Sequence, residues 1–509
     1  MTAAADRYSD LVATLRENAL FASCGNLLNW DEQTYMPHKG AAHRAEQLAL
    51  LAGLSHERAT DPRLGEVLAA LEATGAGRAD DESAQGSVVR EARRAYDRAV
   101  KLPRRLVEEM SRTATLSQQA WIEARKKQDF PAFRPWLEKV VALKREEAAA
   151  VAPSGGVLYD ALLDEYEPGA SAAEIAEVFA GLRRELVPLV SAIRDSGRSP
   201  DASLLTRNYP VAAQRKFCVA AAEAIGFDFE SGRLDEAAHP FCNGIGPGDC
   251  RMTTRYDAAH FPGAFFGTLH EAGHGIYEQG LDAAGFGTAP GTYCSLGIHE
   301  SQSRLWENFV GRSQAFWTHF YPQAQVAFPE ALTGVPLAGF HAAINDVRPS
   351  WIRVESDEVT YNLHIMLRFE LEQALISGDL APAELPGAWN GAFQRDFGMT
   401  PANDALGCLQ DIHWSMGLLG YFPTYTLGNL CAAQLFESAD RELGGLSEQF
   451  SRGEFRPLKA WLNETIHRRG RQYSPSRLIE LVTSRPLSAE ALLRHLRNRF
   501  APLYGLAQS

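Results

Sequence analysis

The chain lacks paired cysteines, long apolar runs and an excess of positive charge. Its seven cysteines are scattered and form no C-x-x-C pair, which argues against a disulfide framework and favours a reducing cytoplasm. No apolar run approaches the ~18–20 residues of a membrane span, and the N-terminus has no basic stretch followed by an apolar one, as a signal peptide would. The net charge of −13 makes phosphate backbones and anionic lipids poor partners. These absences predict a cytoplasmic protein that binds neither nucleic acid nor membranes.

Helical periodicity dominates what is present. Hydrophobic residues make up 45% of the chain, enough for a large core. Apolar residues recur mostly at four-residue steps within 102–123, and amphipathic helices are also expected at 300–316, 359–375, 426–438 and 488–500. We expect a short strand at 252–256 and a helix at 262–277 that stops at Gly280. The sequence therefore predicts a mainly helical protein, with a few short strands beside its richest group of potential ligands.

The segment 270–274 reads HEAGH, an H-E-x-x-H motif within a stretch of helical periodicity. On a helix, His270 and His274 are neighbours on one face and can hold one Zn²⁺ between their imidazoles. Glu271 points about 100° around the helix, so it is poorly placed as a ligand but can act as general base for a water bound to the metal. The spacing therefore supplies two ligands and a base.

A catalytic metal site needs a third protein ligand. Glu278 continues the four-residue series, but it lies about 12 Å along the helix axis from His270, too far to share the metal. Glu300 begins another helical segment and would complete a His₂Glu ligand set. Spacing alone also permits Glu300 to be an ordinary surface residue.

Two further groups of residues bear on the metal centre. A rival set of potential zinc ligands consists of His239, Cys242 and Cys250, with Cys294 as an optional fourth member. It lacks the close ligand pairs of structural zinc sites, so buried apolar cysteines are the better interpretation. The H-E-x-x-H helix also contains three glycines, Gly267, Gly273 and Gly275. Each costs roughly 0.5–1 kcal/mol relative to alanine, which predicts that backbone or substrate approaches this helix closely.

Other motifs follow one another along nearly the whole chain. They are HPF at 239–241, DCRMT at 249–253, HESQ at 299–302, IRVESD at 352–357 and GCLQDIHW at 407–414. Together with the H-E-x-x-H segment they resemble the M32 family of metallocarboxypeptidases, also called the thermostable carboxypeptidase family. The one departure is Ser356, which stands where the family usually has alanine.

The resemblance implies a mainly α fold, a single large helical body with a deep substrate groove and a small β-sheet next to the metal-binding helix. Residues 1–509 would form one peptidase domain, in which N-terminal helices within 1–200 cover the groove and 201–509 carry the metal site. It implies one Zn²⁺ per chain, with Co²⁺ as an alternative. The ligands would be His270, His274 and Glu300, with Glu271 as catalytic base. It also implies a homodimer that removes single C-terminal residues, with broad specificity, from peptides with a free C-terminus.

Several downstream residues are candidates for contact with the substrate. His413 and Tyr425 would donate to the tetrahedral oxygen, because clefts in the family that this chain resembles place a His and a Tyr opposite the metal. Tyr421 has the same candidacy but can equally belong to the core, and His239 is either substrate contact or wall. The planar fork of arginine suits a terminal carboxylate, and the candidates are Arg251, Arg348 and Arg353. Because the chain has 42 Arg and 8 Lys, a structural ion pair is the alternative for each.

Two other functions use the same metal-site residues. One is an endo-acting or dipeptide-releasing metallopeptidase, and the motifs that contain Arg251 and Arg353 argue against it. The other is a non-catalytic helical binding protein that keeps a metal for structure. Glu271 argues against that function, because a purely structural site has no use for a base.

Overall fold

The structure, a computed structural model, describes residues 3–507. The chain divides into two compact units, each built from three stretches of sequence. The first unit comprises the described part of Met1–Val100 with Pro200–Ile344 and Cys431–Pro486, and the second comprises Lys101–Ser199, Asn345–Leu430 and the described part of Leu487–Ser509. Within residues 3–507, no helix is both long and apolar enough to cross a membrane.

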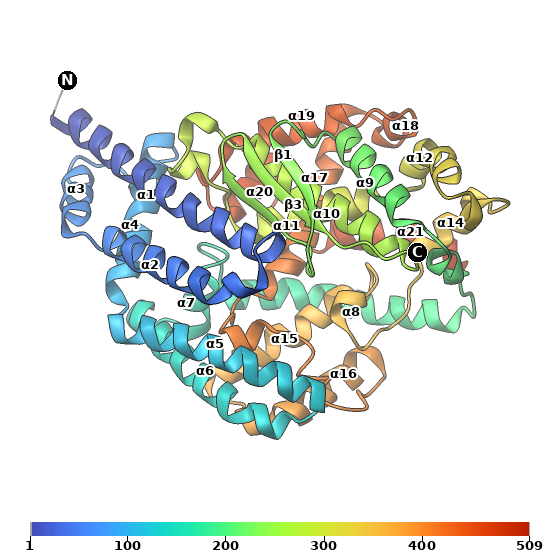
Figure 1. Ribbon diagram of the computed structural model, residues 1–509, viewed down its shortest axis with the longest axis horizontal. Helices are drawn as coiled ribbons and strands as arrows, with labels where there is room; N and C mark the ends of the chain where they lie inside the picture. The colour runs from blue at the N-terminus through green and yellow to red at the C-terminus, as the bar shows by residue number, and fades with distance from the viewer. Residues whose placement is uncertain (1–2, 508–509) are drawn as a thin grey trace. The chain divides into compact units, whose positions relative to one another are not determined.

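The first unit begins with a long helix, α1 (Ala3–Thr34), that packs against α2 (Ala41–Ala59) and α3 (Pro62–Glu72) (Figure 1). Leu11 of α1 and Leu68 of α3 are buried in a small apolar cluster. The other helices of this unit are α4 (Ala84–Lys101), α9 (Val211–Ile225), α10 (Phe261–Gly280), α11 (Leu296–Arg304), α12 (Gln314–Ala327), α13 (Pro329–Leu332), α14 (Leu337–Ile344), α18 (Leu446–Ser451), α19 (Arg456–Thr465) and α20 (Pro475–Thr483).

A three-stranded sheet also belongs to the first unit. Its strands are β1 (Gly232–Glu236), β2 (Cys242–Gly246) and β3 (Asp249–Thr254). β3 is central, β1 runs parallel to it and β2 antiparallel, and α10 packs against both β2 and β3 (Figure 1). Met252, Thr253 and Thr254 are fully buried, as β-branched and apolar residues on a covered strand should be. The expected strand at 252–256 therefore overlaps β3, which starts three residues earlier.

Helix α10 carries the H-E-x-x-H segment. Pro262 lies in its first turn, where the missing N–H has no helical partner to lose, and the helix ends at Gly280 as predicted. Its N-terminal half is anchored by aromatic residues: the rings of Phe261 and Phe265 stack with centroids 5.1 Å apart, and both contact Trp317 of α12. Because this end of α10 is held in a dense core, the segment that follows has a fixed position.

The single helix predicted at 300–316 is wrong. α11 continues without a break as a π-helical turn, Leu305–Val310, and ends at Gly311. A Cβ atom on Gly311 would lie 2.5 Å from a methyl group of Leu269 and 2.8 Å from the carbonyl oxygen of Glu307, so the close passage of α10 excludes a side chain there. α12 then starts anew, with the Ser313 hydroxyl capping the amide of Phe316.

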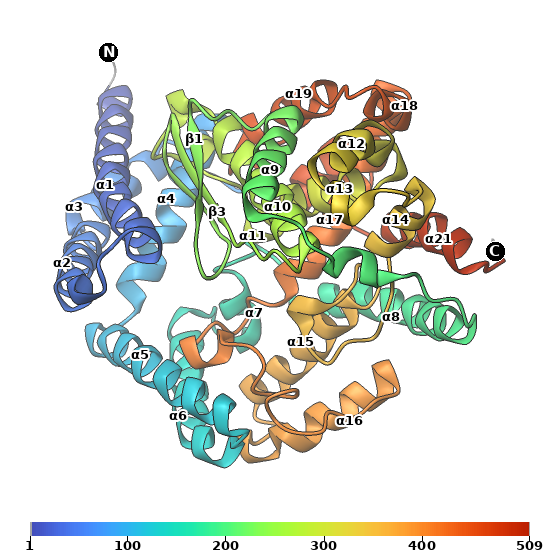
Figure 2. The ribbon, with the colours of Figure 1, turned by 45° about the vertical axis from the view of Figure 1, so that its right-hand side comes forward.

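The second unit contains α5 (Arg104–Lys127), α6 (Phe130–Val151), α7 (Leu158–Leu163), α8 (Ala172–Asp195), α15 (Tyr361–Ser377), α16 (Leu385–Phe397) and α21 (Glu490–Tyr504). α5 and α6 form a hairpin, with Gln128 in the left-handed conformation at the turn and Asp129 capping α6 (Figure 2). The unit boundary falls within α17 (Pro423–Leu443). The helices predicted at 102–123, 359–375, 426–438 and 488–500 are therefore found as α5, α15, α17 and α21.

The predicted fold class, mainly α with a small sheet next to the metal-binding helix, is confirmed. The sheet packs on the helix that carries His270 and His274. The assignment of one peptidase domain, with residues 1–200 covering a groove and 201–509 carrying catalysis, stays a prediction.

Candidate metal centre

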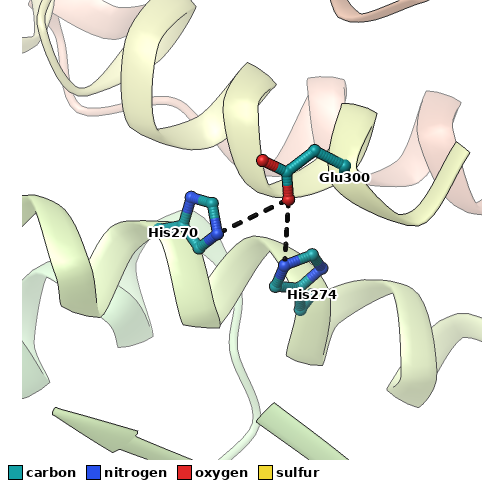
Figure 3. A group of neighbouring side chains, drawn as sticks. All are labelled: His270, His274 and Glu300. Carbon is teal, nitrogen blue, oxygen red and sulfur yellow. Dashed lines mark ion pairs between the residues drawn. The ribbon is translucent and has the colours of Figure 1, made fainter. Parts of the chain in front are cut away.

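Three predicted ligands come together in the first unit. His270 and His274 lie one turn apart on α10, and Glu300 reaches them from α11 (Figure 3). One carboxylate oxygen of Glu300, Oε2, is 3.6 Å from Nε2 of His270 and 3.5 Å from Nε2 of His274. Within residues 3–507, these three form the only group of His, Cys, Asp or Glu residues with donor atoms close enough for one ion, all within 4.8 Å of one another.

The approach of α11 to α10 depends on a glycine. A Cβ atom on Gly273 would lie 2.6 Å from both the carbonyl oxygen of Gln302 and the Cα atom of Ser303, so the backbone of α11 occupies the space that a side chain would need. Gly275 similarly leaves room for the ring of Phe227, at 2.5 Å, whereas Gly267 has only Thr254 at 3.8 Å. The expected close approach is thus found at Gly273 and Gly275 but not at Gly267.

Charged neighbours orient Glu300 and His270. Arg304, one turn after Glu300, donates from Nε to Oε1 of Glu300 at 2.7 Å and from Nη1 to Glu307 at 3.2 Å. This leaves Oε2 of Glu300 facing the two histidines. Nδ1 of His270 lies 2.9 Å from the Glu307 carboxylate, so its proton is held there and its Nε2 lone pair points towards Glu300. Glu307 belongs to the π-helical turn, a feature common at functional sites.

His274 has a different partner behind it. Its Nδ1 atom faces Nδ1 of His299, and Nε2 of His299 contacts Oε1 of Glu278 at 2.8 Å. Burial lowers the pKa of His274 to about 3, with His299 contributing, so His274 is neutral at pH 7. The same burial would lower the pKa of His270, but Glu300 and Glu307 outweigh it and the net shift is upward.

Glu271 is buried, with 6% of its surface exposed. Burial raises the pKa of its carboxyl group to about 7, against a smaller opposing effect of His270. A carboxyl group with a pKa near neutrality can both take up and release a proton at pH 7, which is what a general base and acid must do. Glu300 differs, because Arg304 and the histidines hold its pKa well below the usual range despite its burial.

The donor set and its spacing fit a tetrahedral divalent metal ion. Two ligands about 2.0–2.1 Å from a tetrahedral Zn²⁺ are separated from each other by roughly 3.3–3.4 Å. The observed separations of 3.5 and 3.6 Å between Glu300 Oε2 and the two histidine nitrogens are close to this value. Three protein ligands also leave a fourth position for water or substrate, as catalytic sites require.

A second cluster of charges occupies the second unit. Arg353 and Arg368 both donate to Asp411, at 2.9 Å and 2.7 Å, and both also bond Gln410. Arg353 is 5% exposed and Arg368 fully buried, and their charges hold the pKa of Asp411 well below its usual range against the effect of burial. Because two guanidinium groups share one carboxylate, these three side chains together carry one net positive charge.

His413 and Tyr425 adjoin this cluster. Nε2 of His413 is 3.3 Å from the Tyr425 hydroxyl, Nδ1 of His413 is 3.8 Å from Asp411, and the guanidinium of Arg353 lies over the Tyr425 ring at 5.0 Å. Burial lowers the pKa of His413 to about 4, so it is neutral at pH 7. The Tyr421 ring packs against Tyr425 and His413. The structure therefore brings these three candidates together.

Comparisons with known proteins identify the family of the chain. The family described as carboxypeptidase Taq (M32) metallopeptidase matches residues 10–500. The chain belongs to the M32 metallocarboxypeptidases. This M32 carboxypeptidase is 48% identical to thermostable carboxypeptidase 1 of Thermus thermophilus, over 98% of this chain and 99% of the relative. It is 39% identical to carboxypeptidase 1 of Bacillus subtilis, over 94% and 95% of the two chains.

Solved structures give the same result. The crystal structure of the M32 carboxypeptidase from Deinococcus radiodurans matches with a TM-score of 0.94 and 40% identity, over 98% of this chain and 100% of that one. A structure of Pyrococcus furiosus carboxypeptidase matches with a TM-score of 0.92 and 34% identity, over 97% and 99%. The resemblance inferred from the motifs is thereby confirmed: the chain is a metallocarboxypeptidase, a peptide hydrolase that acts with a metal ion.

The remaining candidates of the carboxypeptidase are Arg251, Arg348 and His239. Arg251 of β3 forms a bidentate ion pair with Asp249, and its guanidinium carbon lies 4.3 Å from the centroid of the Trp30 ring. Arg348 is 58% exposed and pairs with Asp346 at 2.5 Å. His239 is exposed on the segment between β1 and β2. Their assignment to substrate binding stays a prediction.

The rival cysteine site is not assembled. Cys242 and Cys250 contact each other through sulfur atoms 3.5 Å apart, whereas the Cys294 thiol lies 3.4 Å from the backbone of Tyr473. Cys250 and Cys294 are buried, as the interpretation of apolar cysteines expected.

The sequence analysis did not single out three residues that contact the predicted ligands, namely Arg304, Glu307 and His299. A signal for the first two existed, because positions four and seven residues after Glu300 lie on the same helical face. For His299 there was only its place beside Glu300 in the HESQ motif. Which imidazole each residue would meet depends on how α11 crosses α10, and spacing within one helix does not contain that information.

Proposed function

We propose that this carboxypeptidase removes single residues with broad specificity from peptides that have a free C-terminus, using one Zn²⁺ held by His270, His274 and Glu300. The observation that carries the proposal is the convergence of two Nε2 atoms on one oxygen of Glu300. When bound, Zn²⁺, or Co²⁺ in its place, would polarise the scissile carbonyl and lower the pKa of the attacking water.

Glu271 is the proposed base. It follows His270 on α10, and its carboxyl group is buried with a pKa of about 7. In the proposed reaction it takes the proton of the attacking water and then delivers that proton to the leaving amine. The first transfer ends at this carboxyl group and the second starts from it, so a pKa near the working pH favours both transfers.

His413 and Tyr425 are the proposed donors to the oxyanion that forms at the carbonyl. His413 is neutral at pH 7 because burial lowers its pKa to about 4, and the contact between Nε2 and the Tyr425 hydroxyl holds the two groups together. Preorganised donors of this kind stabilise developing negative charge without reorganisation. Tyr421, which packs on both rings, is the third candidate.

Recognition of the terminal carboxylate is assigned to Arg353 first, with Arg251 and Arg348 as alternatives and His239 as a further contact. The net positive charge of the cluster formed by Arg353, Arg368 and Asp411 supports this ranking, since Asp411 neutralises only one of the two guanidinium groups. By contrast, Asp249 neutralises Arg251 and Asp346 pairs with Arg348. A carboxylate needs a fixed cationic partner in a partly dry site.

The proposal also covers the setting of the enzyme. We place it in the cytoplasm as a homodimer built from one peptidase domain per chain, with helices within 1–200 over the groove and the catalytic part in 201–509. The support is the scattered cysteines and the motifs shared with the family.

The test is digestion of a short peptide with either a free or an amidated C-terminus, followed by mass spectrometry over time. We expect a ladder of single-residue losses from the free form and intact amidated peptide. Internal fragments from both forms would instead identify an endopeptidase, and losses in steps of two residues a dipeptide-releasing enzyme.

A further inference from the structure

A second imidazole lies behind the metal-facing side of His274. The Nδ1 atoms of His274 and His299 are 2.5 Å apart, and Nε2 of His299 is 2.8 Å from Oε1 of Glu278. The side chains of His274, His299 and Glu278 are 16%, 12% and 18% exposed. The three residues therefore form a largely buried hydrogen-bonded row that begins at a proposed ligand and ends at a carboxylate.

Only one arrangement of protons in this row leaves His274 able to bind a metal ion. A ligating imidazole is neutral and offers the lone pair of Nε2, so its proton must be on Nδ1. His299 can accept that proton only if its own Nδ1 carries none, which places the proton of His299 on Nε2. An ionised Glu278 accepts hydrogen bonds and donates none, so it selects this arrangement.

The opposite arrangement would block the site. If His299 carried its proton on Nδ1, it would donate to Nδ1 of His274. A neutral His274 would then carry its proton on Nε2, the atom that faces Glu300 at 3.5 Å. The other histidine has no such ambiguity, because Nδ1 of His270 meets the Glu307 carboxylate directly. Each ligand histidine is thus backed by a carboxylate, one directly and one through an inserted imidazole.

The surroundings of the row hold Glu278 in place. A Cβ atom on Gly244 of β2 would overlap Oε2 of Glu278, so the strand passes directly against the carboxylate and a side chain at this position would displace it. The rings of Tyr277 and Tyr293 flank His299 with centroid separations of 5.2 and 5.0 Å. Gly246, two residues further along β2, has only the ring of Phe286 nearby, at 3.6 Å.

We propose that His299 and Glu278 are positioning residues that fix His274 as its Nδ1-protonated tautomer and thereby set the affinity of the enzyme for its metal ion. The inference rests on the proposed ligand set. It gives Glu278 a role that its position on α10 alone does not suggest, since that position rules it out as a ligand.

The experiment measures the zinc dissociation constant of the full-length enzyme by transfer of zinc to a chromophoric chelator. Two variants disturb the row in different ways. Glu278→Gln keeps the shape but can donate as well as accept, and Gly244→Ala pushes the carboxylate aside without changing it. We expect each to raise the dissociation constant by about 10- to 100-fold, the usual effect of removing a partner behind a metal ligand. Gly246→Ala is the matched control and should bind zinc as the parent does.

The metal-free melting temperature of each variant separates positioning from folding. The inference predicts weakened zinc binding in Glu278→Gln and Gly244→Ala at an unchanged metal-free melting temperature. Parental affinity in both variants would overturn it, and so would equal weakening in Gly246→Ala. His274→Ala tests the proposed ligand set separately: parental zinc affinity in that variant would refute the ligand set, whereas lost affinity there with intact affinity in Glu278→Gln refutes only the role of the row.

Discussion

Glu271 and Glu300 show how environment gives two carboxyl groups near the same candidate metal site different properties. Both are buried, with 6% of each residue exposed. Arg304 contacts Glu300 at 2.7 Å and keeps it ionised, whereas burial dominates at Glu271 and raises its pKa to about 7. One group is therefore suited to holding a cation and the other to exchanging a proton.

This difference makes the Glu271→Gln variant informative. We expect it to keep its metal, because the amide side chain would leave all three ligands untouched, and to lose at least ~10²-fold in kcat, the lower scale of general acid–base catalysis. Metal analysis of the purified variant and its turnover of a free-ended peptide give both quantities. Near-parental turnover by a fully loaded variant would exclude Glu271 as the base.

At the scale of single residues, the sequence predicted the three side chains that converge in the candidate metal centre but not those that orient them. H-E-x-x-H spacing predicted the pairing of His270 with His274, because it depends on one helix only. The contacts of Glu307 with His270 and of His299 with His274 join different segments. Such contacts follow from tertiary packing, which periodicity does not encode.

At the scale of elements, the crossing of α10 and α11 determines whether Glu300 reaches the histidines. Gly273 permits the crossing by leaving room for the backbone at Gln302 and Ser303, both of which would lie 2.6 Å from a Cβ atom on this glycine. Backbone cannot move aside as a flexible side chain can, so the helices must separate if this space is filled.

Gly273→Ala should therefore lower both stability and metal content. Overpacking of this kind costs about 1–3 kcal/mol in the free energy of unfolding, and separation of the helices withdraws Glu300 from the site. Gly267→Ala on the same helix is the control, because it meets only Thr254 at 3.8 Å and gains about 0.5–1 kcal/mol of helix propensity. Urea unfolding and metal analysis of the two variants decide the matter, and full metal content in Gly273→Ala would contradict the role given to the crossing.

The buried charges around Asp411 tie α15 to the loop before α17. Arg368 of α15 and Arg353 share its carboxylate, whose pKa is held below the ordinary range in the folded state. A carboxyl group with a lowered folded pKa stabilises the fold above its unfolded pKa, and that stabilisation disappears as the pH falls through the folded value.

Asp411→Asn should thus destabilise the enzyme in a pH-dependent manner. At pH 7 we expect a loss of about 3–5 kcal/mol, the scale for breaking a buried ion pair by removing one partner. Below about pH 4, where the unfolded carboxyl group binds a proton, the difference from the parent should shrink. Unfolding midpoints measured between pH 7 and pH 3 show the trend, and a difference that stays constant over this range would refute it.

At the scale of the whole molecule, the arginines proposed for carboxylate recognition belong to different units. Arg251 lies in the first unit, and Arg348 and Arg353 in the second. The sequence predicted the family and the helical class because each motif is a short local pattern, and such motifs occur along the whole chain. It did not predict the division into units of three stretches each, because that division depends on contacts between distant segments.

Replacement of the three arginines separates recognition of a chain end from structure. Alanine at the residue that binds the carboxylate should lower kcat/KM for free-ended peptides by a factor that corresponds to a loss of about 2–5 kcal/mol in transition-state stabilisation. Lysine at the same position should restore only part of this loss, because it keeps the charge but lacks the planar fork. Cleavage of an amidated peptide should hardly change. Arg104→Ala, with a side chain 86% exposed on α5, is the control. If all three alanine variants keep the parental ratio of free to amidated cleavage, none of the three arginines binds the terminal carboxylate.

In the π-helical turn Leu305–Val310, the number of residues determines the geometry of the site. This turn follows α11 directly and contains Glu307, the partner of His270. A π-helical turn behaves as an α-helix that has gained one residue, so deleting a single residue there would let the helix close normally. A deletion before Glu307, at Leu305 or Trp306, would rotate Glu307 by about 100° relative to Glu300 and Arg304, and no substitution elsewhere on the helix could restore the alignment. Tolerance to insertion and deletion should therefore be lowest in this turn, even where its individual side chains could be exchanged.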